Sequence, residues 1–385
     1  MRLLPLLTAE ETRRAEEAHP GSLDELMERA GTAVAELVLR SFPGRVTVVA
    51  GKGKNGGDAK VCARALGDAG RDVTLVEGSG DLGTPDVVVD GLLGIGLQGA
   101  PREDAARMID LINASGRPVV SIDVPSGVNA STGEISGAAV RATVTVTFGA
   151  AKVGLAVAPG RLHAGAVTVA PLGLRPREHE HALVPASVLL DVPAKQVDST
   201  KYSAGSVLVV GGSRGLTGAV MLASLAAYRA DAGYVAVAAP ESALPVLESA
   251  LLEVVKHPLP EDTSGRLLPR SADAVRRAAS RFGSVVLLKG ADTLVASPRE
   301  GVLVASYGSP ALATAGSGDV LTGIVAAFIA KGIEAQLAAA AAAVAHGVAS
   351  ELLDPPRGAV ASDLLPGLRL ALAGHGLQRA PLAGH

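Results

Sequence analysis

The sequence contains few of the residues that form disulfides, stack on bases or neutralise phosphates. Cys62 is the single cysteine among 385 residues, which excludes an internal disulfide and a multi-cysteine metal site. Aromatic residues make up 2% of the chain and tryptophan is absent, so the usual stacking platforms for single-stranded bases are missing. The 35 basic residues are matched by 38 acidic ones, which leaves no basic footprint for nucleic acid. We therefore expect small-molecule partners.

Targeting segments and long apolar runs are missing as well. The N-terminal segment reaches charged positions after a short apolar run and does not have the pattern of a signal peptide. The longest apolar stretch, 335–345, falls short of the ~20 residues that cross a bilayer. We expect a cytoplasmic protein that binds neither membranes nor nucleic acid and that forms a homo-oligomer.

The chain does have enough apolar material for two cores. Hydrophobic residues make up 48% of it, and 385 residues suit two domains of the usual ~100–200 residues. The stretch 171–200 contains several prolines and has no clear period, which indicates a linker with an entry helix near Ser187 between a domain at 1–180 and a second at 181–385. In both halves β-branched runs alternate with helical patterns, so the fold class is α/β with parallel sheets.

The expected elements follow from these periods. In the first half we expect strands at 45–50, 72–76, 86–89, 118–122, 143–148 and 166–169, with helices at 23–39, 59–69 and 103–113. In the second half we expect strands at 206–210, 234–239, 284–288, 293–296 and 301–305, with helices at 218–232, 319–330, 335–353 and 363–371.

A glycine-rich segment, Gly51–Asp58, connects the first strand of this pattern to a helix. It matches the G-x-G-x-x-G fingerprint, and Glu77 ends the next strand, where a dinucleotide fold places a ribose-binding acid. A redox domain of the Rossmann type is one interpretation. Asn55 and Asp58, however, put polar side chains where a bare backbone would approach a pyrophosphate, which favours a ligand held by side chains as well as amides. The alternative is a tight turn with Asp58 as the N-cap.

Two further aspartates follow predicted strands. Asp90 ends a run of valines, and Asp123 follows Ser-Ile and precedes Val-Pro-Ser-Gly. Open parallel sheets bind ligands at the carboxyl ends of their strands, so we expect Asp58, Asp90 and Asp123 to line one crevice. Each could instead cap the loop that follows it. The three together favour a site.

These motifs resemble the NAD(P)H-hydrate epimerase family. The resemblance rests on Gly51–Asp58, Asp90–Gly96, Asp123–Gly127, Val144–Lys152 and Gly160–Gly165. It implies a Rossmann-like three-layer domain that interconverts the R and S epimers of hydrated nicotinamide dinucleotides, NADHX and NADPHX. It also implies a potassium ion held by Asn55, Asp90 and Ser126.

The same resemblance implies a substrate site and a catalytic acid. The substrate would contact Lys54, Asn55, Gly56, Gly57, Asp58, Gly94, Ile95, Gly96, Leu97, Gln98, Gly99, Ala100 and Asp123. An aspartate beside the nicotinamide ring suits a reaction that removes and re-adds a hydroxyl group. We favour Asp123 for this role, with Asp90 as the second candidate.

In the second half, Ala315–Leu321 opens a helix. Gly316, Ser317 and Gly318 would point free backbone amides at an anion, and the helix dipole would strengthen that attraction. Asp319 follows directly and could take the proton from a hydroxyl that attacks a phosphoryl group. The alternative is an ordinary acid in the first turn of the helix.

A second set of small residues surrounds this motif in the sequence. Lys289–Thr293 joins two predicted strands and could hold an adenylate while Lys289 approaches phosphates. The alternative is an ordinary hairpin, which the residues Gly-Ala-Asp also form. Lys201–Gly205, Gly211–Ser213 and Thr217–Ala219 add positions where a ligand can approach closely.

This set resembles the ribokinase-like, ADP-dependent NAD(P)H-hydrate dehydratases, and Ala361–Leu365 fits their last helix. The resemblance implies that ADP or ATP, with Mg²⁺, phosphorylates the hydroxyl of the hydrate, after which phosphate is eliminated. Asp319 and Ala219 would bind the hydrate. The adenylate would be bound by Lys289, Gly290, Ala291, Asp292, Thr293, Gly316 and Gly318.

Two stretches are shorter than in the families that the chain resembles. They are Glu77–Pro85 and the residues from 259 to 285, so the second domain is a shortened ribokinase-like domain. Two other functions stay open at this point. One is a ribokinase-like small-molecule kinase, because Ala-Gly-Ser-Gly-Asp also serves phosphorylation without elimination. The other is a nucleotide-binding descendant that has lost one or both activities.

Overall fold

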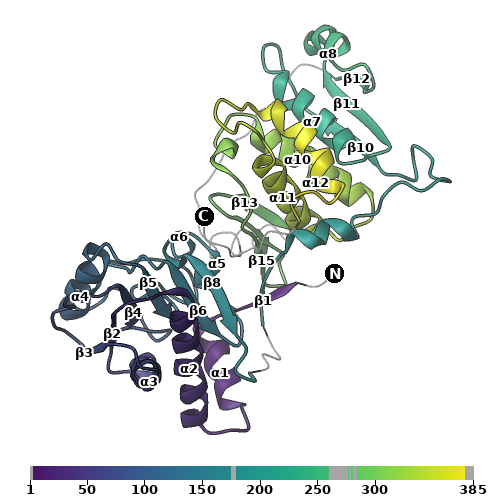
Figure 1. Ribbon diagram of the computed structural model, residues 1–385. Coiled ribbons are helices and arrows are strands. Elements are labelled where there is room, and N and C mark those ends of the chain that lie inside the picture. Colours follow the sequence, from purple (N-terminus) through teal and green to yellow (C-terminus); the bar gives the residue numbers. More distant parts are fainter. Residues whose placement is uncertain (1–2, 175–178, 260–275, 277–278, 281–283, 378–385) are drawn as a thin grey trace. The chain divides into compact units, whose positions relative to one another are not determined.

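The computed structural model describes residues 3–174, 179–259, 276, 279, 280 and 284–377 (Figure 1). By its internal contacts the chain forms two compact units, one made of Pro5–Ala182 and one that begins at Leu183. They are called the N-terminal and C-terminal units below. Within the described residues, no helix is both long and apolar enough to cross a membrane.

The N-terminal unit alternates strands and helices, as the sequence predicts. Its strands are β1 (Leu4–Leu7), β2 (Val46–Ala50), β3 (Val73–Glu77), β4 (Val87–Gly91), β5 (Val119–Ile122), β6 (Val144–Phe148), β7 (Ala151–Lys152), β8 (Ala166–Ala170) and β9 (His181–Leu183). Its helices are α1 (Ala9–Glu17), α2 (Leu23–Ser41), α3 (Lys54–Asp68), α4 (Glu103–Ala114), α5 (Val153–Ala156) and α6 (Arg161–Ala164).

The main sheet of this unit is parallel and lies between two helical layers (Figure 1). Its strand order is β3-β2-β4-β5-β6-β8, and every neighbouring pair is parallel. Val48 and Val89 pack in one cluster with α2 and α3, whereas Val49 and Val88 pack with α4. Alternate residues of each strand thus face opposite layers, which explains why the strands are apolar throughout. The predicted three-layer α/β fold is confirmed.

The stretch expected to be a linker with an entry helix near Ser187 contains a strand that was not predicted, β9, in which His181 is 7% exposed. The entry helix is present as a 3₁₀ helix at Ala186–Asp191. The sequence patterns also missed β1 and α1. Thr8 and Glu11 form a capping box at the start of α1, and the spacing of these two residues was a usable signal.

The C-terminal unit is also α/β. Its strands are β10 (Ser206–Val210), β11 (Tyr234–Pro240), β12 (Val255–Leu259), β13 (Val286–Lys289), β14 (Thr293–Ala296) and β15 (Val302–Ala305). Its helices are α7 (Gly218–Arg229), α8 (Leu244–Ala250), α10 (Ser317–Ala330), α11 (Ala335–Glu351) and α12 (Leu364–Leu372), with 3₁₀ turns at Glu241–Ala243, Pro310–Leu312 and Ala361–Asp363.

Among the described residues, two sheet segments and five helices build the core of this unit, and α8 contributes through Leu247. β10, β11 and β12 are parallel, whereas β13, β14 and β15 follow one another as antiparallel hairpins. The apolar cluster includes residues of α7, α10, α11 and α12, and α11 contributes a nearly continuous run of buried alanines. The small side chains of that run let neighbouring elements approach closely. The stretch from 260 to 283, where the family motifs are shortened, lies almost entirely outside the described residues.

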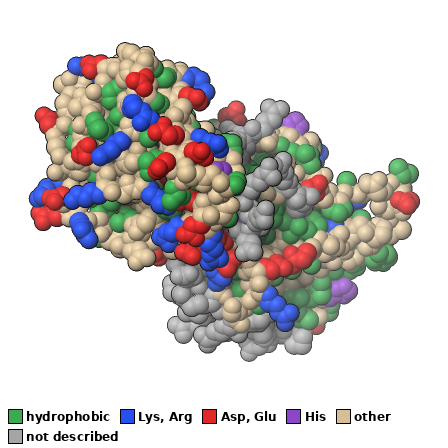
Figure 2. All heavy atoms as spheres, turned by 90° about the horizontal axis from the view of Figure 1, so that it is seen from below, with side chains coloured by type: hydrophobic (Ala, Val, Ile, Leu, Met, Phe, Trp, Pro, Cys, Tyr) green, Lys and Arg blue, Asp and Glu red, His purple; other side chains and the backbone are tan. Residues whose placement is uncertain are grey.

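The surface carries both signs of charge. On the face shown in Figure 2, Lys and Arg side chains are interspersed with those of Asp and Glu. Exposed ion pairs such as Lys60–Glu77 and Arg64–Glu28 illustrate this pattern. Such pairs contribute only about 0–1 kcal/mol each to stability. They matter here as charged groups that a ligand could contact.

Candidate functional site

A cleft of about 910 Å³ lies at the carboxyl ends of the strands in the N-terminal unit. Its walls come from the segment after β2, the loop after β4, Asp123 directly after β5, and Phe148 at the end of β6. This is the edge at which parallel sheets bind ligands, because the loops that follow the strands leave an open crevice there. The cleft therefore has the position that the sequence predicts.

The glycine-rich segment enters this cleft mostly as a helix. We expected the helix to begin near residue 59, but α3 begins at Lys54, and Gly53 rather than Asp58 is its N-cap. Gly56 lies in the first turn of this helix, where a Cβ would lie 1.8 Å from the carbonyl oxygen of Gly51. Glycine is needed at this position for a close backbone approach, and that requirement is compatible with a helix.

This early start arranges the predicted substrate residues in two groups. Those whose atoms line the cleft are Lys54, Asn55, Asp58, Gly94, Ile95, Gly96, Leu97, Gln98, Ala100 and Asp123. Gly57 lines a smaller adjoining cavity, and Gly56 is buried in the turn. Gly99, with a φ of 72°, shapes the loop between two lining residues.

A buried ion pair lies beside the cleft. Lys152 is fully buried, and its Nζ lies 2.5 Å from Oδ1 of Asp123, 3.0 Å from Oγ1 of Thr147 and 2.9 Å from the carbonyl oxygen of Phe148. Thr147 Oγ1 also donates a hydrogen bond to the same Asp123 oxygen, at 3.0 Å. The sequence patterns did not single out Lys152, although a lysine among Ala, Val and Gly residues is unusual enough to notice.

Asp58 has an environment that favours its protonated form. Burial raises its pKa to about 8, and the nearby charges of Asp123 and Glu16 act in the same direction. Lys54 and Lys152 lower the pKa, but by less. Near neutral pH the cleft therefore holds a protonated Asp58 beside Asp123, whose Oδ1 is paired with Lys152. Two carboxyl groups with environments this different suit the two halves of an acid–base reaction.

Asp90 lies beneath the cleft and does not line it. It belongs to β4, is fully buried, and accepts hydrogen bonds from Ser121 Oγ at 2.9 Å, Ser126 N at 2.9 Å and Ser126 Oγ at 2.6 Å. Burial raises its pKa, and these hydrogen bonds oppose that effect. Asp58 and Asp123 therefore share the crevice as expected, whereas Asp90 supports the loop that contains Ser126.

The predicted ligands of the potassium ion come together at this place. Asn55 Nδ2 donates a hydrogen bond to the carbonyl oxygen of Leu93 at 2.9 Å. Ser126 Oγ, whose proton goes to Asp90, accepts a hydrogen bond from the amide of Leu93 at 2.8 Å. Among the described residues, Oδ1 of Asn55 accepts no hydrogen bond, so it can serve a cation. Amide, carboxylate and hydroxyl oxygens are hard donors that suit a hard monovalent cation. The described residues contain no cluster of three or more His, Cys, Asp or Glu side chains that could hold a metal.

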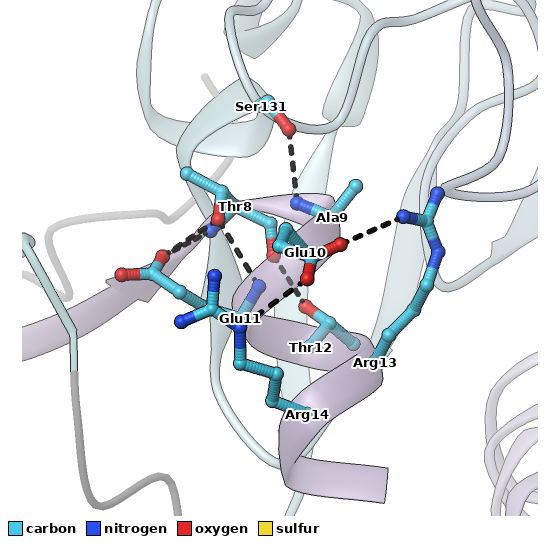
Figure 3. Close-up of polar contacts among 8 residues, drawn as sticks. All are labelled: Thr8, Ala9, Glu10, Glu11, Thr12, Arg13, Arg14 and Ser131. Atoms are coloured by element: carbon cyan, nitrogen blue, oxygen red, sulfur yellow. Dashed lines mark hydrogen bonds and ion pairs between the residues drawn. The ribbon is translucent and has the colours of Figure 1, made fainter. Parts of the chain in front are cut away.

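The first helix contributes residues that the sequence patterns missed. Arg13 and Glu16 of α1 line the cleft, and Glu16 accepts a hydrogen bond from Lys54 at 2.9 Å. Figure 3 shows how the start of α1 is held: Ser131 Oγ accepts a hydrogen bond from the amide of Ala9 at 2.9 Å. The capping box and this contact fix the direction of the helix. They thereby place the basic side chain of Arg13 and the acidic side chain of Glu16 at the cleft.

In the C-terminal unit, the predicted phosphate motif forms the start of helix α10. Gly316 has a φ of 89° and is the N-cap of α10, which begins at Ser317, two residues before the predicted start. Ser317 is buried, whereas Gly318 is exposed and Asp319 is half-buried. At the start of this 14-residue helix the amides of Asp319 and Val320 both donate to the carbonyl oxygen of Gly316, at 3.0 and 3.2 Å. The amide of Ser317 donates to the carbonyl oxygen of Thr314 at 3.4 Å.

The predicted adenylate residues are connected to this helix start. Gly290, Ala291 and Asp292 form the turn between β13 and β14, whose register pairs Lys289 with Thr293. Nζ of Lys289 lies 3.3 Å from Oγ of Ser317, so the two motifs meet at this contact. Ala219 lies in the first turn of α7 and is exposed.

His346 lies below the same contact. It is 2% exposed, and burial together with the charge of Lys289 lowers its pKa to about 4. Its Nε2 has no hydrogen-bond partner among the described residues. The sequence indicated a packed histidine on an alanine-rich helix, and the structure confirms that prediction.

Comparison with protein families separates the two units in the same way. A family model described as the YjeF-related protein N-terminus matches residues 23–82 and 74–154, and one described as NAD(P)H-hydrate dehydratase matches 207–275 and 267–366. Each match comes in two overlapping pieces. The overlaps fall in the two stretches that are short in this sequence, which is expected where a segment of the family has no counterpart.

Whole-chain relatives agree with these matches. Bifunctional NAD(P)H-hydrate repair enzymes from Moorella thermoacetica and Pyrobaculum aerophilum are 31% and 32% identical, over 88% and 85% of this chain and 90% and 89% of theirs. A Bacillus subtilis ADP/ATP-dependent NAD(P)H-hydrate dehydratase, co-crystallised with ATP and Mg²⁺, is 20% identical with a TM-score of 0.44, over 49% of this chain and 95% of that one. Both resemblances seen in the sequence are confirmed, and the chain belongs to the family of bifunctional NAD(P)H-hydrate repair enzymes.

Proposed function

We propose that this chain repairs hydrated nicotinamide dinucleotides in two steps. An epimerase domain at 1–180 interconverts the R and S forms of NADHX and NADPHX, and a dehydratase domain at 181–385 converts the S form to NADH or NADPH with ADP or ATP. The observation that carries the proposal is the cleft with Asp58 and Asp123 in a chain whose relatives have this repair function by name.

The epimerase step uses the two carboxyl groups of the cleft in opposite roles. Protonated Asp58 donates its proton to the leaving hydroxyl group, and the carbon–oxygen bond breaks with both electrons going to oxygen, so that water leaves. The nicotinamide ring nitrogen shares its electron pair with the resulting cation. Water then adds to the other face of the ring and gives a proton to Asp123. Exchange with solvent returns each carboxyl group to its starting state.

Potassium is proposed as the cation of this domain. Asn55, Asp90 and Ser126 would hold it, and its charge would stabilise the position of the loop after β4. The protein's own contribution is to present hard oxygens from α3, β4 and the segment after β5 at one place. The asparagine oxygen that accepts no hydrogen bond is the observation that supports this assignment.

The dehydratase step depends on the start of α10. The hydroxyl oxygen of the hydrate would attack the terminal phosphorus of ADP, its proton would pass to Asp319, and the bond to the AMP oxygen would break. The carbon–oxygen bond then breaks, inorganic phosphate leaves with the electron pair, and the neighbouring ring carbon loses a proton to water, which yields NADH. The amide of Gly318 and the positive end of the α10 dipole would bind the transferred phosphoryl group, and Lys289 lies close enough to that helix start to neutralise charge. Mg²⁺ would accompany the nucleotide and supply further charge neutralisation.

One experiment tests the two activities separately. Purified R-NADHX is incubated with the full chain and K⁺ but without ADP, and chromatography follows the appearance of the S epimer above the spontaneous rate. ADP and Mg²⁺ are then added to S-NADHX, and the absorbance of NADH is followed. Asp123→Asn should abolish the first activity alone, and Asp319→Asn the second alone.

Other outcomes identify the alternative functions. A stable phosphorylated product without NADH would favour the ribokinase-like kinase, and nucleotide binding without turnover would favour a descendant that has lost activity. We also propose that the protein works in the cytoplasm, since its single buried cysteine suits a reducing compartment. A homo-oligomeric state stays a prediction, which sedimentation velocity tests.

A further inference from the structure

Glu77 and Lys60 form an exposed ion pair at one end of the cleft. Glu77 ends β3, and its register partner Ala50 ends β2, directly before the glycine-rich segment. Lys60 belongs to α3, and its Nζ lies 2.9 Å from Oε2 of Glu77. The side chains are 47% and 62% exposed for Lys60 and Glu77, so both can reach a ligand. The epimerisation step described above uses neither residue.

A second cavity of about 440 Å³ has this ion pair in its wall. It shares Gly51, Lys52, Gly53, Glu77 and Gly78 with the larger cleft, so the two spaces are continuous. A Cβ on Gly78 would meet no atom within 4 Å, which shows open space beside Glu77. The groove therefore runs from the reacting carboxyl groups, past the start of α3, to the Lys60–Glu77 pair.

The two ends of this groove lie on opposite sides of β2. Asp123 follows β5 and Phe148 ends β6, on the side of β2 where β4, β5 and β6 lie in the sheet. Glu77 ends β3, the strand on the other side of β2. In open α/β sheets a dinucleotide spans this switch in strand order, with its pyrophosphate over the glycine-rich turn and one nucleoside on each side. Because the nicotinamide ring must reach Asp58 and Asp123, the adenosine half extends toward Glu77.

We propose that Glu77 binds the 2′-hydroxyl of the adenine-side ribose and makes the epimerase domain prefer NADHX over NADPHX. The proposal rests on the proposed epimerase function and adds a subsite to it. A carboxylate accepts a hydrogen bond from the ribose hydroxyl, whereas it repels the phosphate that NADPHX has at this position. In the native protein the charge of Lys60 is offset by that of Glu77, so the pair attracts a phosphate less than Lys60 alone would.

The test is a competition between the two substrates in one tube. R-NADHX and R-NADPHX are mixed with the full chain and K⁺ without ADP, so only epimerisation occurs, and chromatography gives the ratio of the two kcat/KM values. We expect the native ratio to favour NADHX. In Glu77→Gln the ratio should shift toward NADPHX by about tenfold, since a repulsion is removed and Lys60 is released.

Glu28→Gln is the matched control, because Glu28 is also an exposed glutamate paired with a basic residue of α3, Arg64, but lies outside the groove. It should leave the ratio unchanged. Equal ratios in the native protein and in Glu77→Gln would overturn the proposal while leaving the epimerase function intact. Failure of the native protein to epimerise either substrate would instead contradict the function.

A structural readout tests the subsite without activity. Crystals of the full chain soaked with ADP-ribose should place the adenine-side ribose within hydrogen-bonding distance of Glu77. A ribose placed instead over the Gly94–Arg102 loop would overturn the proposal, whatever the outcome of the kinetic test.

Discussion

The ammonium group of Lys152 lies 2.5 Å from Oδ1 of Asp123, and it has no exposed surface. Asp123 has a φ of 63°, an uncommon conformation for a residue other than glycine, and it directly follows β5. β7 holds Lys152 through its parallel pairing with β1, where Leu7 is the register partner of Lys152. The proposed base of the epimerase is thus fixed by contacts from two different parts of the unit.

Removal of the lysine should damage both stability and activity. Lys152→Met leaves the Asp123 carboxylate buried without its cation, which should lower the free energy of unfolding by about 3–5 kcal/mol and abolish epimerisation. The double variant Lys152→Met with Asp123→Asn removes both charges and should regain much of that stability without regaining activity. Thermal melting and the chromatographic assay measure the two effects. A double variant as unstable as the single one would contradict this account of the pair.

Asp58 gives the epimerase a defined pH dependence. Its pKa is raised to about 8, so the proton that it donates is present at neutral pH and is lost as the pH rises through about 8. The epimerisation rate should therefore fall above pH 8, and Asp58→Asn should be slow at every pH. The Asp319→Asn variant, altered only in the other unit, should keep the native profile. A rate that stays constant from pH 7 to pH 10 would exclude Asp58 as the proton donor.

The glycines of the first motif should differ sharply in their tolerance of a side chain. A Cβ on Gly56 would clash with the Gly51 carbonyl oxygen, whereas one on Gly53 would meet nothing within 4 Å. We expect Gly56→Ala to destabilise the N-terminal unit by about 1–3 kcal/mol. Gly53→Ala, the control on the same turn, should stay within about 0.5 kcal/mol of the native protein. Melting temperatures compare the two, and equal losses would show that the close approach is not what requires glycine.

The periodic elements were predictable because their physical causes are local. The valine runs of β2, β4 and β5 are buried on both faces, and such runs are visible in the sequence without knowledge of neighbours. The start of α3 was misplaced because glycines at 56 and 57 lower helix propensity, while the contact that requires Gly56 involves the backbone of Gly51 in a folded turn.

The site was predictable only in part, for a related reason. The strand-end rule located Asp123 and the motif located Asp58, but Lys152 reaches Asp123 from a position 29 residues later in the chain. Glu16 reaches Lys54 across 38 residues, from a helix too short to show a strong period. Such pairs depend on the register of β1 with β7 and on the direction of α1, and no local pattern encodes either.

The C-terminal unit should lose stability in acid because of His346. Its pKa is lowered to about 4 in the folded state, so the unfolded chain takes up a proton near pH 6.5 while the folded one does not. Stability is therefore full above pH 6.5 and falls as the pH drops toward 4, by roughly 3 kcal/mol in total. His346→Gln should flatten this part of the pH dependence, whereas a matched change of the exposed His375 to Gln should not. Denaturant unfolding of the three proteins between pH 7 and pH 4 measures the slopes, and the same slope in all of them would show that His346 is not the group responsible.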